Sequence, residues 1–215
     1  MLINFDELIS KHGVTNVRGI LHVGAHTAEE RNDYSECGIN RVIWIEANPG
    51  VFLQLMRNVA HLPGHSYHWF AAIEENDKIV ELNIASNGES SSIFDFDEHT
   101  TEHPSVTWVG KTRVLTRRID DFLFSSGYDP ECFNFVNLDI QGAELLALKG
   151  MSNILNGVDY IYTEVNEKYL YKNCCLIGEI DDFLSDFGFS RKVTEMTRHG
   201  WGDALYARGA SCNEY

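Results

Sequence analysis

Acidic side chains stand where three apolar segments of the sequence end, a placement that suits proton transfer or the binding of a polar ligand. Glu46 ends the first segment, Asp139 the second and Glu164 the third, where Asn166 follows. A carboxylate is rarely buried beside apolar residues unless it is paired or functional. We therefore predict that Asp139 and Glu164 are catalytic, with Asp139 accepting or orienting the proton of a reacting hydroxyl group.

The same oxygen atoms could bind a hard divalent cation, which prefers carboxylate and amide ligands. Asp139, Glu164 and Asn166 are the candidate ligands. A hydrogen-bonded polar cluster also explains these residues, and we favour that interpretation, so no metal site is predicted. Glu144 lies near the start of the next helix, where it either stabilises the helix dipole or contacts a substrate.

A tight turn after the first predicted strand has the character of a ligand-binding loop. The segment 21–26 runs from apolar residues into Gly24 and Ala25, and small residues there allow a ligand to approach the backbone. Glu46 follows about 20 residues later, where a Rossmann-like site places the acid that binds ribose hydroxyls. Alternatively, Gly24 only makes a turn and Glu46 only ends a strand.

The loop lacks the GxGxxG pattern of a dinucleotide site, because Ala28 stands where a further glycine could be. Glu29 and Glu30 would also repel a pyrophosphate at the start of the following helix. A sulfonium cofactor carries a positive centre and no phosphate, so it tolerates these acids. An NAD-dependent sugar oxidoreductase and a catalytically degenerate cofactor-binding interaction domain remain the alternatives.

Apolar segments alternate with amphipathic ones, which predicts strands and helices in turn. The predicted strands are 18–23, 41–47, 67–73, 78–85, 133–140 and 160–165, followed by a terminal hairpin of 190–196 and 203–207. The predicted helices are 5–9, 27–37, 49–59, 119–124, 143–148 and 177–187. This order predicts one α/β domain, 1–215, with an N-terminal helix within 1–17. Its mostly parallel sheet is covered by helices on both faces and binds ligands at the carboxyl ends of its strands.

The segment 86–111 shows no sustained periodicity and is predicted to be a lid or substrate loop. His99 and His103 could act as catalytic bases if this segment folds over the cleft; ordinary loop histidines are the alternative. The aromatic residues of the segment either stack on sugar rings or anchor the loop: Phe94, Phe96 and Trp108.

The chain is acidic, with 17 Lys and Arg against 32 Asp and Glu and a net charge of −15. Such a surface repels phosphate backbones, so nucleic acid is a disfavoured partner. Five cysteines form no CxxC pair, which favours reduced thiols and a cytoplasmic location. Asp6 and Glu7 stand where a signal peptide would be basic, and no apolar run is long enough to span a membrane.

Four blocks resemble the FkbM family of class I methyltransferases: 21–26 with 46–49, 116–122, 136–151, and 162–166. The tail 202–206 is similar too. The resemblance implies a Rossmann-like fold with a seven-stranded sheet that ends in an antiparallel strand. It also implies transfer of a methyl group from S-adenosylmethionine to a hydroxyl oxygen of a sugar, glycan or small metabolite. The predicted cofactor-binding residues are His22, Gly24, Ala25, His26, Glu46, Ala47, Asn48, Ala72 and Asp139.

The chain departs from the family pattern at three positions. His26 stands where Asn is usual, and Ala28 replaces a usual Gly. Gln141 stands where Glu is common, which removes one carboxylate from the predicted catalytic edge.

Overall fold

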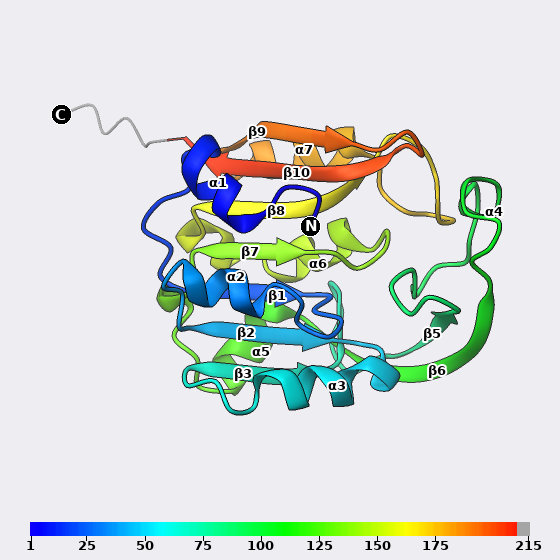
Figure 1. Cartoon of the computed structure of the whole chain (residues 1–215), viewed down its shortest axis with the longest axis horizontal. Helices are drawn as coiled ribbons and strands as arrows, with labels where there is room; N and C mark the ends of the chain where they lie inside the picture. The colour runs from blue at the N-terminus through cyan, green and yellow to red at the C-terminus, as the bar shows by residue number, and fades with distance from the viewer. Residues whose placement is uncertain (210–215) are drawn as a thin grey trace.

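A seven-stranded sheet runs through the computed structural model, which describes residues 1–209 (Figure 1). The strand order is β3-β2-β1-β7-β8-β10-β9. The first five of these are mutually parallel, and β10 is antiparallel to both β8 and β9, as predicted. The strands are β1 (Ile20–Val23), β2 (Val42–Glu46), β3 (His65–Trp69), β7 (Phe135–Leu138), β8 (Tyr160–Asn166), β9 (Phe189–Met196) and β10 (Trp201–Arg208).

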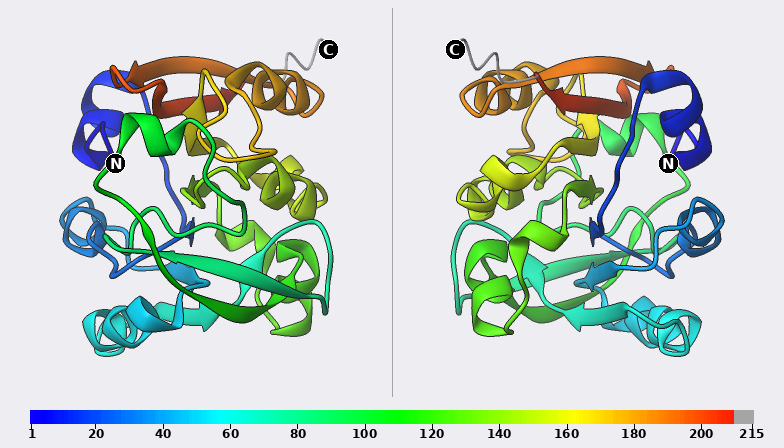
Figure 2. Two further views of the ribbon diagram at one scale, coloured as in Figure 1. Left: turned by 90° about the vertical axis from the view of Figure 1, so that its right-hand side faces the viewer. Right: turned by 90° about the vertical axis from the view of Figure 1, so that its left-hand side faces the viewer.

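Helices cover both faces of this sheet (Figure 2). One face carries α1 (Phe5–His12), α2 (Arg31–Glu36) and α3 (Pro49–Val59), and the other carries α5 (Ile119–Ser125), α6 (Glu144–Gly150) and α7 (Ile177–Ser185). Each layer has its own apolar core, because the helices of that layer bury apolar side chains against the sheet. The fully buried residues of the first core include Phe5, Tyr34, Trp44 and Leu55; those of the second include Ile119, Leu148, Ile161 and Ile180.

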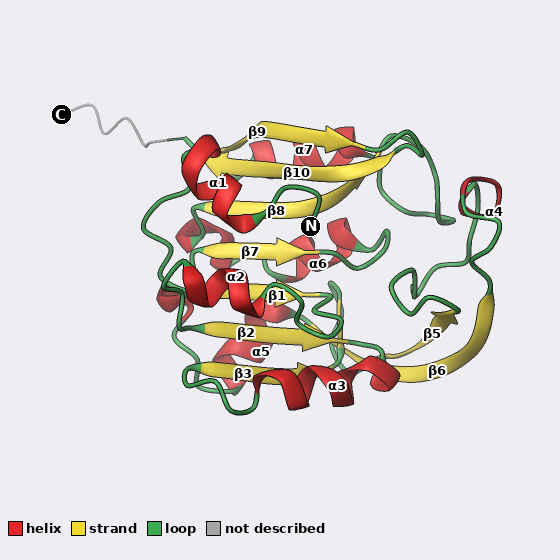
Figure 3. Cartoon of the chain, viewed as in Figure 1, coloured by secondary structure: helices red, strands yellow, loops and turns green. Residues whose placement is uncertain are grey.

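A smaller sheet lies beyond the carboxyl ends of the parallel strands, beside α4 (His99–Glu102) (Figure 3). Its order is β4-β6-β5, with β4 (Ala71–Ala72), β5 (Ile79–Ala85) and β6 (Trp108–Arg117). The predicted strand 67–73 is therefore two strands in two sheets. The predicted loop 86–111 contains α4 and the start of β6.

Strand β6 was not predicted, because its two faces do not separate apolar from polar residues. Thr112 and Thr116 point to the less exposed side of the strand, whereas Val109 and Leu115 are exposed. A half-buried strand is recognised in a sequence when its apolar residues lie on the buried face and its polar residues on the exposed face, and β6 reverses this pattern.

Helix α2 begins at Arg31, four residues later than the predicted helix 27–37. Ala28 has a left-handed backbone, with φ of 61°, and this conformation cannot continue a right-handed helix. The segment before Arg31 therefore forms turns.

The described cysteines Cys37, Cys132, Cys174 and Cys175 are free thiols, and Cys212 lies outside the described residues. Within 1–209, no helix combines the length and apolar character that crossing a lipid bilayer requires.

Candidate active site

A cavity of about 550 Å³ opens at the carboxyl ends of β1, β2, β7 and β8. Residues from both sheets and from α4 line it, so the small sheet completes a site that the large sheet begins. Ala71 and Ala72 of β4, both buried, form part of an apolar wall with Phe70 and Ile73. Glu46 and Asp139 line the same continuous space.

At Gly24 the backbone of the first loop lies against the residue that follows β7, Asp139. The Gly24 N–H and that of Ala25 both donate to the Ile45 carbonyl oxygen, at 2.9 and 3.0 Å. A Cβ atom at position 24 would lie 1.6 Å from the Asp139 carbonyl oxygen, and the backbone φ is 85°. Only glycine can adopt this backbone conformation and also fit against the Asp139 carbonyl without moving the end of β7.

Glu46, the last residue of β2, is 8% exposed. Its two carboxylate oxygens accept hydrogen bonds from the backbone N–H groups of His26 and Asn48, at 2.8 and 2.6 Å. Each carboxylate oxygen can accept a second hydrogen bond. Burial raises the pKa of Glu46 to about 7.

Two of the predicted cofactor-binding side chains have structural partners. The His22 ring packs against Trp44 and lies 3.1 Å from the Tyr34 hydroxyl, and burial lowers its pKa to about 3. The Asn48 side chain accepts from the Gly50 N–H and so caps α3. Asn48 therefore supports the site through its backbone contact with Glu46.

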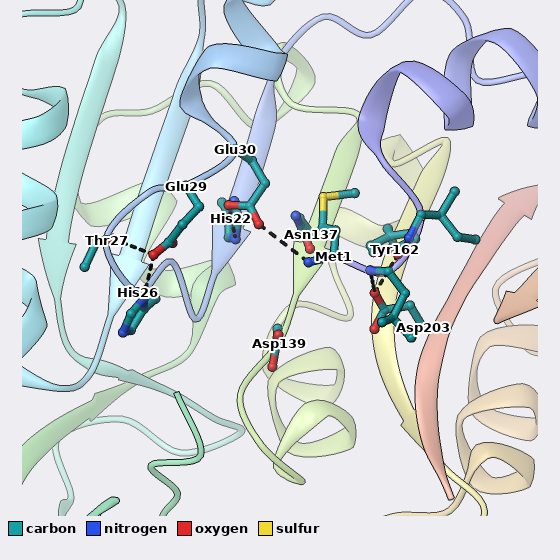
Figure 4. Close-up of polar contacts among 12 residues, drawn as sticks. Met1, His22, His26, Thr27, Glu29, Glu30, Asn137, Asp139, Tyr162 and Asp203 are labelled. Atoms are coloured by element: carbon teal, nitrogen blue, oxygen red, sulfur yellow. Dashed lines mark hydrogen bonds and ion pairs between the residues drawn. The ribbon is translucent and has the colours of Figure 1, made fainter. Parts of the chain in front are cut away.

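The segment after Gly24 presents acidic groups to the cavity. His26 Nδ1 lies 2.8 Å from Glu29 Oε1, and this hydrogen bond raises the pKa of His26 (Figure 4). Glu30 lies further along, where burial raises its pKa. The expected acidity of this loop is thus present beside the cavity.

A three-residue contact lies at the predicted catalytic edge. The Gln141 amide nitrogen donates to Asp139 Oδ1 at 2.6 Å and to Glu164 Oε2 at 2.8 Å. Asp139 is accessible from the cavity, but the surrounding protein desolvates it. This desolvation, with the nearby Asp203 charge, raises the pKa of Asp139; the pKa of Glu164 is raised chiefly by burial.

Glu144 and Asn166, the other two polar residues predicted at this edge, are not among the residues that line the cavity. Glu144 accepts at Oε1 from the N–H groups of Ile140 and Gly142, at 3.0 and 3.1 Å, so it closes the turn before α6. The Asn166 amide lies 3.5 Å from Glu164 Oε1. Within the described chain, no three His, Cys, Asp or Glu side chains form a group that could hold a metal ion.

Asp203 and Tyr162 form a second polar pair in the cavity wall, beyond Asp139 in the close-up (Figure 4). The Tyr162 hydroxyl donates to Asp203 Oδ2 at 2.6 Å, and so does the Leu2 N–H at 2.6 Å. The Met1 nitrogen lies 3.8 Å from Glu30 Oε1. The sequence pattern did not identify these residues as part of the site, because they come from opposite ends of the chain.

His99 and His103 both line the cavity. His99 is 4% exposed, stacks on Phe96 at a ring distance of 4.0 Å, and its Nδ1 has no hydrogen-bond partner among the described residues. Burial lowers the pKa of His99 to about 4, which makes it a weaker proton acceptor than an ordinary histidine. Phe96 also stacks on Trp108 at 3.6 Å, so these aromatic rings anchor the segment.

Solved structures of low sequence identity share this fold. Sp1610 of Streptococcus pneumoniae in complex with S-adenosyl-L-methionine has a TM-score of 0.53 and 13% identity, over 94% of this chain and 71% of that chain. The ribosomal protein L11 methylase of Lactobacillus delbrueckii subsp. bulgaricus has a TM-score of 0.50 and 9% identity, over 94% and 75%. The fold is therefore the Rossmann-like fold of class I methyltransferases.

The chain belongs to the FkbM methyltransferase domain family, whose model matches residues 22–191. The resemblance seen in the sequence blocks is thereby confirmed. The 2-O-methyltransferase NoeI of Sinorhizobium fredii is 32% identical over 116 residues, which make up 54% of this chain and 46% of NoeI. The matched part thus spans about half the length of that relative.

Proposed function

We propose that this chain is an S-adenosylmethionine-dependent O-methyltransferase that acts on a hydroxyl group of a sugar, glycan or small metabolite. The observation that carries the proposal is that a single cavity joins the buried Glu46 carboxylate to Asp139. The first is suited to ribose hydroxyls and the second to a reacting hydroxyl group. Family membership and the name of the 2-O-methyltransferase NoeI support the same activity.

The residues present fit this cofactor. Glu46 would hold the ribose hydroxyls, the Ala71–Ala72 wall would contact the adenine, and Gly24 leaves the loop backbone open to close approach. The carboxylates of the cavity suit a ligand with a positive centre. No Lys or Arg side chain within 1–209 lines the cavity, which disfavours the pyrophosphate of NAD.

Bound S-adenosylmethionine would supply an electrophilic methyl group. Asp139 would accept the hydroxyl proton at Oδ2, because its Oδ1 already accepts from Gln141. The lid residues of 86–111 would exclude water from the reacting groups, and the cavity walls would align them. His99 and His103 would form part of the cavity wall that the 86–111 segment contributes.

A binding measurement followed by a transfer assay tests this proposal. Calorimetry with S-adenosylmethionine should give a saturable signal, and NADH should give none. Transfer of a labelled methyl group to a panel of mono- and oligosaccharides then identifies the acceptor. Binding of NADH in place of S-adenosylmethionine would overturn the proposal.

The acceptor should be neutral or cationic. Carboxylates of Glu30, Asp139, Glu164 and Asp203 line the cavity, and an anionic acceptor would be repelled by them. We expect kcat/KM for a phosphorylated sugar to be lower than for its neutral parent by about tenfold or more at low salt. The difference should shrink as salt is raised, because salt screens the repulsion. A preference for the phosphorylated sugar would contradict this electrostatic argument.

Cofactor affinity should fall as the pH drops through about 7, because Glu46 takes up a proton there and ribose hydroxyls donate best to the carboxylate form. A single coupled proton predicts a Kd about tenfold weaker at pH 6 than at pH 8. Calorimetry at pH 6 in two buffers of different ionisation enthalpy should report proton release on binding.

The control for this pH dependence is Glu46→Gln, which keeps the shape of the side chain and removes its titration. The variant should bind weakly at every pH from 6 to 8. If it retains the wild-type pH dependence, another group such as His26 is responsible.

A further inference from the structure

Gln141 places one amide group between two carboxylates at the catalytic edge. Its Nε2 atom contacts Asp139 Oδ1 and Glu164 Oε2, at 2.6 and 2.8 Å, so both amide hydrogens are used. Two ionised carboxylates this close repel each other, and the burial of Glu164 strengthens the repulsion. The two N–H groups offset part of that repulsion, because a hydrogen bond donated to a carboxylate stabilises its charged form.

The orientation of this amide is fixed from its other end. The Tyr171 hydroxyl donates to Gln141 Oε1 at 2.6 Å, which leaves the nitrogen to face the carboxylates. The Ser92 hydroxyl donates to the Gln141 backbone carbonyl at 2.7 Å. Gln141 has a left-handed backbone with φ of 56°, a conformation that residues other than glycine rarely adopt. Tyr171 and the 86–111 segment therefore hold Gln141 in an otherwise unfavourable conformation.

The other charged or titratable groups around this pair do not replace the amide. They are Glu144 on α6, Asp203 on β10, Glu30 before α2, the Met1 nitrogen and Tyr171. Three of these five groups are acids, and one of them, Asp203, already accepts hydrogen bonds from the Tyr162 hydroxyl and the Leu2 N–H. Among residues 1–209, Gln141 provides the only side-chain nitrogen that contacts both Asp139 and Glu164.

We propose that Gln141 is a positioning residue that keeps Asp139 and Glu164 together as carboxylates and leaves Asp139 Oδ2 free for the acceptor hydroxyl. This inference rests on the proposed methyl transfer. Gln141 acts through Asp139 and does not itself exchange a proton. Without its two N–H groups, the pair would retain a proton to higher pH, and Asp139 would be a base over a narrower range.

The test is Gln141→Met, which keeps the length of the side chain and removes both donors. The acidic limb of the kcat/KM profile should move up by about one pH unit, so activity near that limb falls about tenfold and recovers at higher pH. Gln141→Glu adds a third carboxyl group and should move the limb in the same direction. Gln54→Met, on the exposed side of α3, is the matched control and should leave the profile unchanged.

A second variant tests the same inference if the substitutions at position 141 prevent folding. Tyr171→Phe removes only the hydroxyl that orients the amide, and it should shift the same limb by a smaller amount. A carboxyl ¹³C titration by NMR on Asp- and Glu-labelled protein should show an upward shift in both variants, smaller in Tyr171→Phe, without requiring turnover. Equal loss of activity at every pH with unmoved carboxyl titrations would overturn the inference. Absence of methyl transfer by the wild-type protein, with the titration shift present, would instead overturn the proposed function.

Discussion

Replacement of Asp139 by Asn should lower kcat by roughly 10²–10⁴-fold, the range associated with loss of a general base. Asn keeps an oxygen that can accept from Gln141, so the contact at Oδ1 survives. It removes the negative charge that accepts the hydroxyl proton. Because the Gly24 loop and Glu46 are untouched, we expect the Kd for S-adenosylmethionine to change less than tenfold.

The measurement is a pre-steady-state methyl-transfer assay at saturating cofactor and acceptor, with calorimetric cofactor binding beside it. Asp182→Asn, an exposed residue on α7, changes the net charge equally and should leave kcat unchanged. Full methyl transfer by Asp139→Asn would remove Asp139 from the role of base. Attention would then pass to the two histidines that line the cavity, His99 and His103.

The order of strands and helices was accessible from the sequence because four of the five parallel strands are buried on both faces. The strands β1, β2, β7 and β8 therefore appear as short apolar runs with β-branched residues. Parallel strands end at one edge of the sheet, so the acids that follow them had to meet there. Glu46 and Asp139 do line a common cavity.

The contacts that complete the site were not accessible, because they join residues that no local pattern relates. Tyr171 reaches Gln141 from 30 residues further along the chain, and Asp203 reaches Tyr162 from the antiparallel strand β10. Strand β6, which pairs with the cavity-lining strands β4 and β5, exposes apolar residues and so lacks the alternation that would have revealed it. Tertiary packing decided these features.

The three departures from the family pattern share a physical property. His26, Ala28 and Gln141 all have left-handed backbones, with φ of 43°, 61° and 56°. Asn and Gly adopt that conformation more readily than other residues, which explains their usual presence at positions 26 and 28. In this chain, hydrogen bonds provide the restraint instead: the His26 N–H donates to Glu46, and its ring contacts Glu29.

Gly24→Ala should be the most destabilising single substitution in the cofactor loop. The new Cβ would lie 1.6 Å from the Asp139 carbonyl oxygen, a backbone atom that can move only if the end of β7 moves. Left-handed backbone strain and overpacking together predict a loss of about 3–5 kcal/mol in the free energy of unfolding. Cofactor binding should be lost as well, because the loop and Asp139 are displaced together.

Gly38→Ala separates the two contributions. Gly38 also has a left-handed backbone, with φ of 78°, but a Cβ there meets no atom within 4 Å. This control should therefore lower the free energy of unfolding by only about 1 kcal/mol, the strain alone, and leave cofactor binding intact. Urea unfolding of both variants measures the difference. If Gly24→Ala is no less stable than Gly38→Ala, the loop is free to move away from β7, and Gly24 does not couple the cofactor loop to the position of Asp139.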